Sequence, residues 1–182
     1  MEIRIVDLTE ENLKDLPEIG NFPYSCKYCI YWEEPEEFLV ANKIPKEKLY
    51  QLKLNWFKSV SKSFGSPGKI LYIDDAPVGF SQFAPPKMLP NVYKIFSTLP
   101  GKDAIYLSCL YIPKREFRGR KFGQMMLESV IEEVQRRKFK AIETFARKNS
   151  SDNPSGPYEF YVKNGFKVVF EDFEFPLLRK EL

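Results

Sequence analysis

The chain of 182 residues contains no histidine and only three cysteines. The absence of histidine excludes a Ser-His-Asp triad, a histidine general base and a histidine-ligated metal. Any acid–base chemistry must therefore be carried by carboxylates, tyrosine, cysteine, lysine or water. Cys26, Cys29 and Cys109 are too few, and odd in number, to indicate a disulfide scaffold.

Long apolar runs are absent as well. No segment approaches the roughly 20 apolar residues that a membrane-spanning helix needs, and the N-terminus lacks the apolar core of a signal peptide. We therefore expect a cytoplasmic protein with no membrane partner. The charge is nearly balanced, because 28 Lys and Arg residues stand against 25 Asp and Glu residues. A net charge of +3 is too small to indicate a nucleic-acid partner.

The composition is that of a globular protein, with 43% hydrophobic and 15% aromatic residues. Repeats, low-complexity tracts and linker-like segments are absent from the sequence. We therefore expect a single domain over residues 1–182 that is large enough for a substantial core. The sequence leaves open whether this domain is a monomer or a homodimer.

Hydrophobic periodicity predicts a mixture of strands and helices. The expected strands cover Ile3 to Ile5 and residues 69–73, 78–83, 105–112, 140–146, 166–170 and 174–178. The expected helices cover residues 10–19, 46–64, 122–137 and 157–163, the first capped by Thr9 and ended by Gly20. Hairpins come early and βαβ-like crossovers late. This order predicts an α/β fold with a mixed, mostly antiparallel sheet and helices on both faces.

The most distinctive segment is the basic, glycine-containing stretch of residues 115–127 (REFRGRKFGQMML). It follows a strand-like apolar run that ends at Pro113, and an amphipathic helix begins inside it. A helix start offers unpaired N–H groups and the positive end of the helix dipole, to which the cationic side chains add charge. The segment therefore indicates either a site for a phosphorylated cofactor or a solvated basic turn before an ordinary helix.

The element order and residues 106–166 resemble the GNAT superfamily of N-acetyltransferases. That family has the motif (Arg/Gln)-x-x-Gly-x-(Gly/Ala) at a helix start, matched here by Arg118 and Gly123, with Lys121 in place of the inner glycine. It also has Leu-Tyr-x-x-x-Gly-Phe near the C-terminus. The corresponding run here is Phe160-Tyr161-Val-Lys-Asn-Gly-Phe166. Together the two motifs favour the cofactor interpretation of the basic segment.

The resemblance implies an N-acetyltransferase in which an amine attacks the thioester of acetyl-CoA directly, in a ternary complex and without a metal. The cofactor half would cover about residues 104–170, and segments 20–45 and 85–103 would shape the acceptor site. Asn153 lies one residue too far from the family's asparagine position, so a plain loop is the alternative there. The cofactor-binding residues implied are Leu110, Tyr111 and Ile112 for the pantetheine arm, and Arg118, Gly119, Arg120, Lys121, Phe122, Gly123 and Gln124 for the pyrophosphate.

The resemblance also suggests catalytic residues. Tyr161 matches the tyrosine that lies near the cofactor sulfur, so its phenol would protonate the departing CoA thiolate as a general acid. The other interpretation of Tyr161 is a helix tyrosine packed on the sheet. Tyr158 lies on the same helical face and is the alternative donor. Glu143 is the candidate general base, with two alternatives: a surface role for Glu143, or attack by a neutral amine whose proton passes to water.

Two features of residues 22–37 have more than one interpretation. The Cys26-x-x-Cys29 pair is a redox dithiol, half of a metal site, or a pair of structural or substrate-lining cysteines. The preceding Pro23 and the following aromatic residues favour the last interpretation. The four glutamates between Glu33 and Glu37 would attract a cationic amine or form a solvated acidic face.

The acceptor implied is a small-molecule or peptide amine, and three alternatives to an acetyl-CoA-dependent N-acetyltransferase stay open. The chain could use another acyl-CoA, or it could acylate a protein N-terminus or a lysine. It could also be a non-catalytic module on the same fold that senses acyl-CoA or binds RNA or another partner. The non-catalytic alternative is supported by Lys121, which replaces a glycine of the family motif, and by the lack of a clear general base.

Overall fold

The computed structural model describes residues 1–19, 22–150 and 152–182. It contains a seven-stranded sheet with strand order β1-β2-β3-β4-β5-β7-β6. β4 and β5 are parallel, and the other neighbouring strands are antiparallel. The strands are β1 (Ile3–Asp7), β2 (Gly68–Ile73), β3 (Ala76–Ala84), β4 (Ala104–Tyr111), β5 (Ala141–Phe145), β6 (Lys167–Phe170) and β7 (Leu177–Glu181). The predicted mixed, mostly antiparallel sheet is confirmed.

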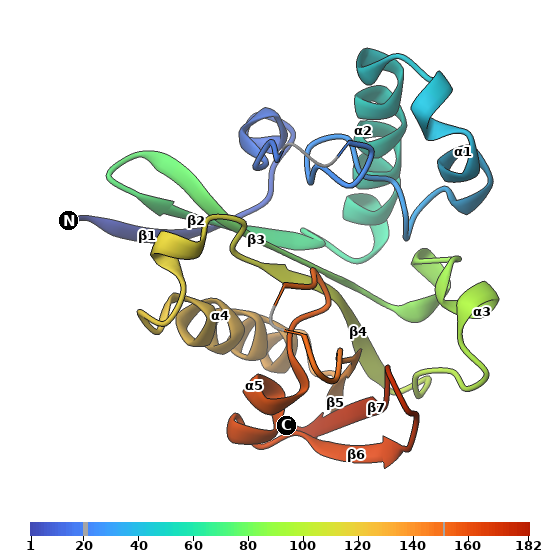
Figure 1. Ribbon diagram of the computed structural model, residues 1–182, viewed down its shortest axis with the longest axis vertical. Helices are drawn as coiled ribbons and strands as arrows, with labels where there is room; N and C mark the ends of the chain where they lie inside the picture. Colours follow the sequence, from blue (N-terminus) through green and yellow to red (C-terminus); the bar gives the residue numbers. More distant parts are fainter. Residues whose placement is uncertain (20–21, 151) are drawn as a thin grey trace.

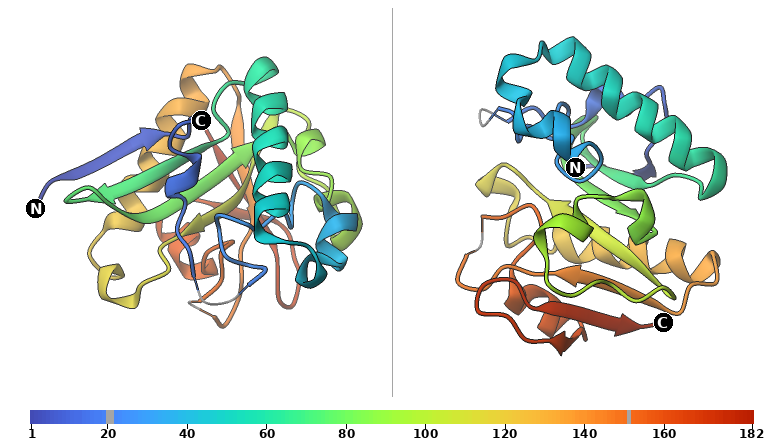
Figure 2. Two further views of the ribbon diagram at one scale, coloured as in Figure 1. Left: turned by 90° about the horizontal axis from the view of Figure 1, so that it is seen from above. Right: turned by 90° about the vertical axis from the view of Figure 1, so that its right-hand side faces the viewer.

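Helices cover both faces of this sheet, as predicted. α1 (Pro35–Leu39) and α2 (Lys46–Ser63) lie on one side, and α4 (Phe122–Arg136) and α5 (Tyr158–Lys163) on the other (Figures 1 and 2). The short α3 (Val92–Ile95) interrupts the long connection between β3 and β4. Within the described residues, none of the helices has the length and apolar character needed to cross a membrane.

Two large hydrophobic clusters join the layers. In α4, Met126, Val130 and Val134 are fully buried against one face of the sheet, and their four-residue spacing is that of a helical face. In α2, Trp56 and Val60 pack against the opposite face. β4 and β5 lie between these layers and are therefore covered on both sides, which explains the mostly apolar sequence of β4 and the burial of every residue of β5.

The segment after β1 differs from the prediction. Thr9 caps this segment as predicted, and it exchanges two hydrogen bonds with Asn12, from Thr9 N to Asn12 Oδ1 (2.7 Å) and from Asn12 N to Thr9 Oγ1 (3.2 Å). The helix predicted over residues 10–19 is nevertheless a single 3-10 turn at Leu13–Asp15. Pro17 disfavours helical geometry at Leu16, whose ψ is 137°, so the turn cannot continue. The predicted helix end at Gly20 lies outside the described residues.

The last strand begins later than predicted, at Leu177 instead of residue 174. Oδ1 of Asp172 accepts hydrogen bonds from the backbone N–H groups of Glu174 and Phe175 (2.8 and 2.7 Å). This local turn uses the donors that a strand would need, and Pro176 offers no N–H at all. The strand therefore starts after the proline.

Candidate functional site

The parallel strands β4 and β5 pair over a short distance and then separate. Their register joins Ala104–Tyr106 to Ala141–Glu143. Beyond this point β4 contains a bulge, because Gln82 of β3 faces Cys109 whereas Phe83 faces Leu107, which leaves Ser108 as an extra residue. A bulge redirects the side chains and backbone groups that follow it. The end of β4 thereby becomes the centre of the candidate site.

The segment that follows β5 fills the space between the two separated strands. The Leu110 N–H donates to the carbonyl of Pro154 (2.8 Å). On the other side, the Arg147 N–H donates to the carbonyl of Gly156 (3.0 Å). Leu110 is one of the residues predicted to bind the pantetheine arm, and its N–H is thus engaged by the protein itself.

The basic loop before α4 has the backbone geometry of an anion site. Gly119 and Lys121 have positive φ angles of 74° and 64°, and Lys121 immediately precedes the helix. This conformation explains why the family motif has glycine there, since a side chain in it costs roughly 1–2 kcal/mol. Within the part of the chain that the structure describes, the N–H groups of residues 122–124 have no hydrogen-bond acceptor.

Arg118 holds this loop in place through its side chain. Its Nε donates to the carbonyl of Ile112 (2.7 Å), and its Nη2 donates to the carbonyl of Pro113 (3.0 Å) and to Oδ1 of Asp152 (2.8 Å). Asp152 also accepts a hydrogen bond from Tyr111 Oη (2.8 Å). Hydrogen bonds from Arg118 and then Tyr111 lower the pKa of the Asp152 carboxyl. Arg118 therefore joins the loop, the end of β4 and the segment after β5.

A groove of about 710 Å³ runs along the end of β4 past the basic loop to α5. Arg120 and Phe122 are not among the described residues that line this groove. The predicted cofactor-binding residues that do line it are Leu110, Tyr111, Ile112, Arg118, Gly119, Lys121, Gly123, Gln124 and Asn153. The structure thus brings most of the predicted cofactor residues to one surface.

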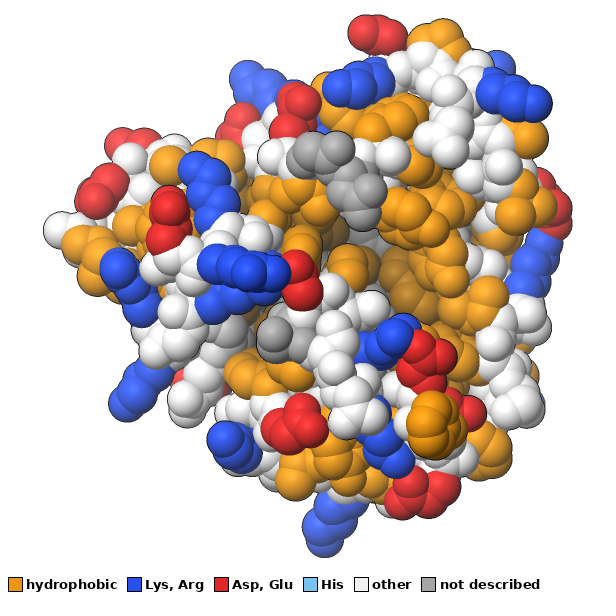
Figure 3. Space-filling model, viewed as in Figure 1, with side chains coloured by type: hydrophobic (Ala, Val, Ile, Leu, Met, Phe, Trp, Pro, Cys, Tyr) orange, Lys and Arg blue, Asp and Glu red, His pale blue; other side chains and the backbone are white. Residues whose placement is uncertain are grey.

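A second cavity, of about 310 Å³, shares Tyr111 and Asn153 with the groove. Figure 3 shows a hollow surrounded by hydrophobic side chains on this face of the molecule. Both predicted acceptor-shaping segments contribute to the cavity, the first through residues 24–33 and the second through Ile95 and Phe96. We call this space the aromatic cavity. Its aromatic lining residues are Tyr24, Tyr31, Trp32, Phe80, Phe96, Tyr111 and Phe175.

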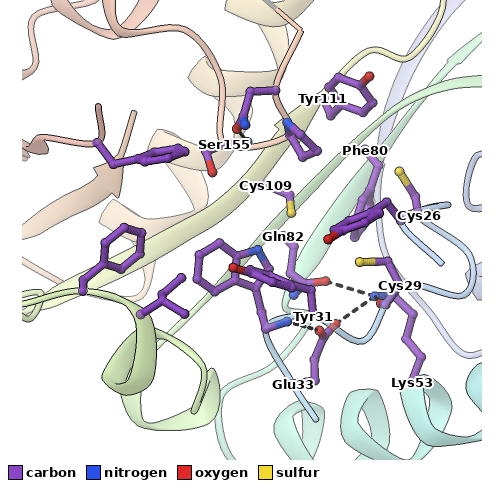
Figure 4. Close-up of a pocket in the computed structure, with 17 residues that line it drawn as sticks. Cys26, Cys29, Tyr31, Glu33, Lys53, Phe80, Gln82, Cys109, Tyr111 and Ser155 are labelled. Carbon is purple, nitrogen blue, oxygen red and sulfur yellow. Dashed lines mark hydrogen bonds and ion pairs between the residues drawn. The ribbon is translucent and has the colours of Figure 1, made fainter. Parts of the chain in front are cut away.

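A buried ion pair closes one side of the aromatic cavity (Figure 4). Lys53 and Glu33 are only 2% and 3% exposed, and Lys53 Nζ lies 2.8 Å from Glu33 Oε1. The same ammonium donates to the carbonyl of Cys29 (2.7 Å) and to Gln82 Oε1 (3.3 Å), so all three of its protons are used. Burial by itself would lower the pKa of Lys53, but the charge and the hydrogen bond of Glu33, together with the nearby Cys29 and Cys109, outweigh burial and raise this pKa.

Sequence analysis missed Lys53 and Gln82, although each interrupts an apolar pattern. Lys53 lies four residues after the buried Leu49 on the apolar face of α2. Gln82 alternates with Phe80 and Ala84 on the face of β3 that packs toward α2. A polar side chain at such a position needs a partner in the interior. A polar residue at an otherwise apolar position of a helix or strand was therefore the sequence signal that could have identified Lys53 and Gln82.

Of the two interpretations of the glutamates between Glu33 and Glu37, the attraction of a cationic amine has little support in the structure. Of the four glutamates, Glu33 is the one that lines the cavity, and Lys53 neutralises it. Glu36 is exposed and forms an ion pair with Lys94. Among the described residues that line the cavity, acidic and basic charges therefore balance.

The two residues proposed for catalysis lie in different surroundings. Tyr161 is fully buried, and its hydroxyl donates to the carbonyl of Ser155 (2.8 Å), a residue that lines the aromatic cavity. Burial raises the pKa of Tyr161 above its ordinary value of 10.0. Glu143 accepts hydrogen bonds from the Gly101 N–H and from Arg179 (2.7 Å each) and, as far as the chain is described, lines neither cavity. Tyr161 does not line either cavity itself as far as the chain is described, but its hydroxyl reaches the aromatic cavity through Ser155. Glu143 has no such link, because Arg179 and Gly101 engage its carboxylate.

The three cysteines gather at the aromatic cavity, which Cys26, Cys29 and Cys109 all line (Figure 4). Burial raises the pKa of Cys26 to about 11 and that of Cys29 to about 12, so both thiols are protonated at neutral pH. A redox dithiol needs a lowered thiol pKa. No cluster of three or more His, Cys, Asp or Glu side chains suited to a metal ion occurs in residues 1–19, 22–150 and 152–182. The cavity-lining interpretation fits best.

The sheet, the separation of β4 from β5 and the basic loop at the start of α4 belong to a fold that the chain shares with solved N-acetyltransferase structures. Solved structures agree with this. The chain is similar to the PaiA N-acetyltransferase from Thermoplasma acidophilum in complex with coenzyme A, at 19% identity and a TM-score of 0.61, with 100% of both chains covered. The resemblance seen in the sequence is thereby confirmed at the level of the fold.

Two further solved structures show the same likeness. The ribosomal-protein-alanine N-acetyltransferase from Brucella melitensis is 18% identical, with a TM-score of 0.59 over 98% of this chain and 99% of that one. The NatC complex bound to Gag peptide and CoA contains a chain that is 14% identical, with a TM-score of 0.59 over 100% of this chain and 99% of that one. The sequence matches no protein-family model and no curated protein.

Proposed function

We propose that the chain is an N-acetyltransferase that moves the acetyl group of acetyl-CoA to an amine. The main observation behind this proposal is that Tyr111 and Asn153 line both the groove at the start of α4 and the aromatic cavity. One extended molecule can therefore place its phosphates at the basic loop and its reactive end at the cavity. The likeness to structures solved with coenzyme A supports a coenzyme A derivative as this molecule.

The cofactor would be held chiefly by backbone groups. The free N–H groups of residues 122–124 and the positive end of α4 would bind the pyrophosphate, with Lys121 adding charge. The pantetheine arm would lie along the end of β4, like an added strand. Because the carbonyl of Pro154 now occupies the Leu110 N–H, the arm must displace this carbonyl to reach that donor.

Acetyl transfer would proceed by direct attack in the ternary complex. The amine nitrogen forms a bond to the thioester carbon, the carbon–sulfur bond breaks, and the sulfur leaves with the electron pair. Tyr161 would supply the proton to this thiolate, and its raised pKa keeps the phenol protonated until then. Since Glu143 is held away from the cavities, the proton of the amine would pass to water.

A thiol-release assay tests this function. The protein with acetyl-CoA should release free CoA thiol when amines are added, and no thiol when they are omitted. The panel should contain aromatic monoamines, amino acid amides, polyamines and peptides with a free N-terminus. Binding of acetyl-CoA in a calorimeter without release for any amine would contradict the enzyme and favour an acyl-CoA sensor.

Lys121 gives a second prediction, because its strained backbone and its charge can be separated. Lys121→Gly should raise the free energy of unfolding by about 1 kcal/mol, since glycine adopts a φ of 64° without steric cost. The same change should weaken acetyl-CoA binding about 3–10-fold, because a charge-assisted contact to phosphate is lost. Denaturant unfolding and calorimetry measure the two effects.

Lys121→Ala is the matched variant for this prediction. Alanine removes the charge but keeps a side chain at the strained position, so affinity should fall as in the glycine variant without the gain in stability. Tighter acetyl-CoA binding by the glycine variant would show that the Lys121 side chain obstructs the phosphate.

A further inference from the structure

Gln82 is the buried polar side chain of the aromatic cavity that the proposed chemistry does not use. It lies on β3 opposite Cys109, is 1% exposed and lines the cavity. Its amide nitrogen is buried and has no hydrogen-bond partner among the described residues. Leaving such a donor unpaired costs about 1–3 kcal/mol, so it calls for an explanation.

The orientation of this amide follows from its neighbour. Gln82 Oε1 accepts a hydrogen bond from Lys53 Nζ (3.3 Å), and the reversed amide would set its two N–H donors against an ammonium that can only donate. Lys53 is itself fixed by Glu33 and by the carbonyl of Cys29. Figure 4 shows this connection from Lys53 to Gln82 and Glu33. The amide nitrogen is therefore the end left for a ligand.

Charge and shape restrict what that ligand can be. The Lys53–Glu33 pair is neutral as a unit, so a second ammonium on an acceptor would find no unpaired carboxylate among the described lining residues. The aromatic walls favour an apolar body. A volume of about 310 Å³ is close to the lower end of the range of roughly 300–1,000 Å³ for small-molecule sites. These features fit a compact molecule with a single amine.

We propose that the acceptor is a small monoamine with an aromatic or aliphatic body and a hydrogen-bond-accepting oxygen, and that Gln82 binds this oxygen through its amide nitrogen. The proposal rests on the proposed acetyltransferase function and specifies its acceptor class. Gln82 is then a specificity-determining residue. The Gln82 amide nitrogen, which lacks a hydrogen-bond partner among the described residues, would donate to the oxygen of the substrate.

Two amines and one variant test this. Phenylalaninamide and phenethylamine share the ring and the amine, and only the first carries a carbonyl oxygen. The wild-type protein should favour phenylalaninamide by about fivefold or more in kcat/KM per concentration of the unprotonated amine, the worth of one neutral hydrogen bond. Gln82→Glu keeps an oxygen for Lys53 and removes the donor, so it should abolish this preference.

Equal use of both amines by the wild type, an unchanged preference in the variant, or better use of spermidine or a peptide N-terminus would overturn the proposal.

Binding without acetyl-CoA separates this inference from the proposed function. Trp32 lines the cavity, so its fluorescence should change when an amine enters, whether or not transfer follows. A Gln82-dependent preference for phenylalaninamide in this titration, with no thiol release, would refute the acetyltransferase and support the role of Gln82. Thiol release with equal titration curves for both amines would support the enzyme and refute the role of Gln82. The comparison of two amines on the wild-type protein does not depend on whether the variant folds.

Discussion

Replacing Lys53 by methionine should lower the free energy of unfolding by about 3–5 kcal/mol. Methionine fills similar space but leaves the Glu33 carboxylate buried without a counter-charge, and it also removes the donors to Cys29 and Gln82. The loss of an ion pair is this large only where both partners are shielded from water, as they are here. Urea unfolding followed by tryptophan fluorescence measures the effect.

The same helix provides a matched control. Lys58 of α2 forms an ion pair with Glu10 (2.7 Å), and both side chains are about half exposed. Lys58→Met should therefore change the free energy of unfolding by less than about 1 kcal/mol. The double variant Lys53→Met with Glu33→Gln should recover part of the loss, because no uncompensated charge remains. Equal effects of Lys53→Met and Lys58→Met would contradict the importance of burial.

The buried pair also has a consequence for the dependence of stability on pH. The pKa of Lys53 is raised in the folded protein above its ordinary value of 10.5. A raised pKa means that the folded state holds this proton more tightly, so the stabilisation is fully present below 10.5. It is lost as the pH rises through the raised pKa. The pair therefore acts as a constant stabilising contact at neutral pH.

Replacing Tyr161 by phenylalanine should lower kcat by about 100-fold while leaving the affinity for acetyl-CoA nearly unchanged. This expectation rests on the proposed acid role. The effect is placed at the low end of the range for general acids because burial raises the pKa of the phenol, which makes it a weaker acid. Steady-state thiol release at saturating acetyl-CoA gives kcat, and calorimetry gives the affinity.

A second buried tyrosine controls for the loss of a hydroxyl. Tyr106 of β4 is fully buried, and its hydroxyl has no partner among the described residues. Tyr106→Phe should keep full turnover and should not destabilise the fold, because no hydrogen bond is lost. Full turnover by Tyr161→Phe would contradict the acid role. A loss in Tyr158→Phe instead would transfer that role to Tyr158, whose ring lies 5.5 Å from Lys148 Nζ.

Elements whose pattern is repeated along the chain could be predicted, and elements decided by a single local contact could not. The helix of α4 repeats its apolar spacing over four turns, and the basic loop before it has a recognisable motif. The predicted helix at residues 10–19 failed because Pro17 affects the residue before it more strongly than Thr9 and Asn12 favour a helix. The start of β7 was misplaced because the Asp172 side chain competes for backbone donors.

The sequence by itself determined the sheet with its two helical layers and the basic, glycine-containing loop of residues 118–124 before α4, because both depend on periodicity and local backbone chemistry. Only the tertiary structure decided which distant residues meet at the site. Lys53, Glu33 and Gln82 come from α2, the segment before α1 and β3, and nothing in their sequence spacing links them. Two further contacts depend on the tertiary structure: Arg179 binds the Glu143 carboxylate outside the cavities, and the Pro154 carbonyl accepts a hydrogen bond from the Leu110 N–H. Such contacts depend on how packed layers bring remote segments together, and local sequence does not encode that.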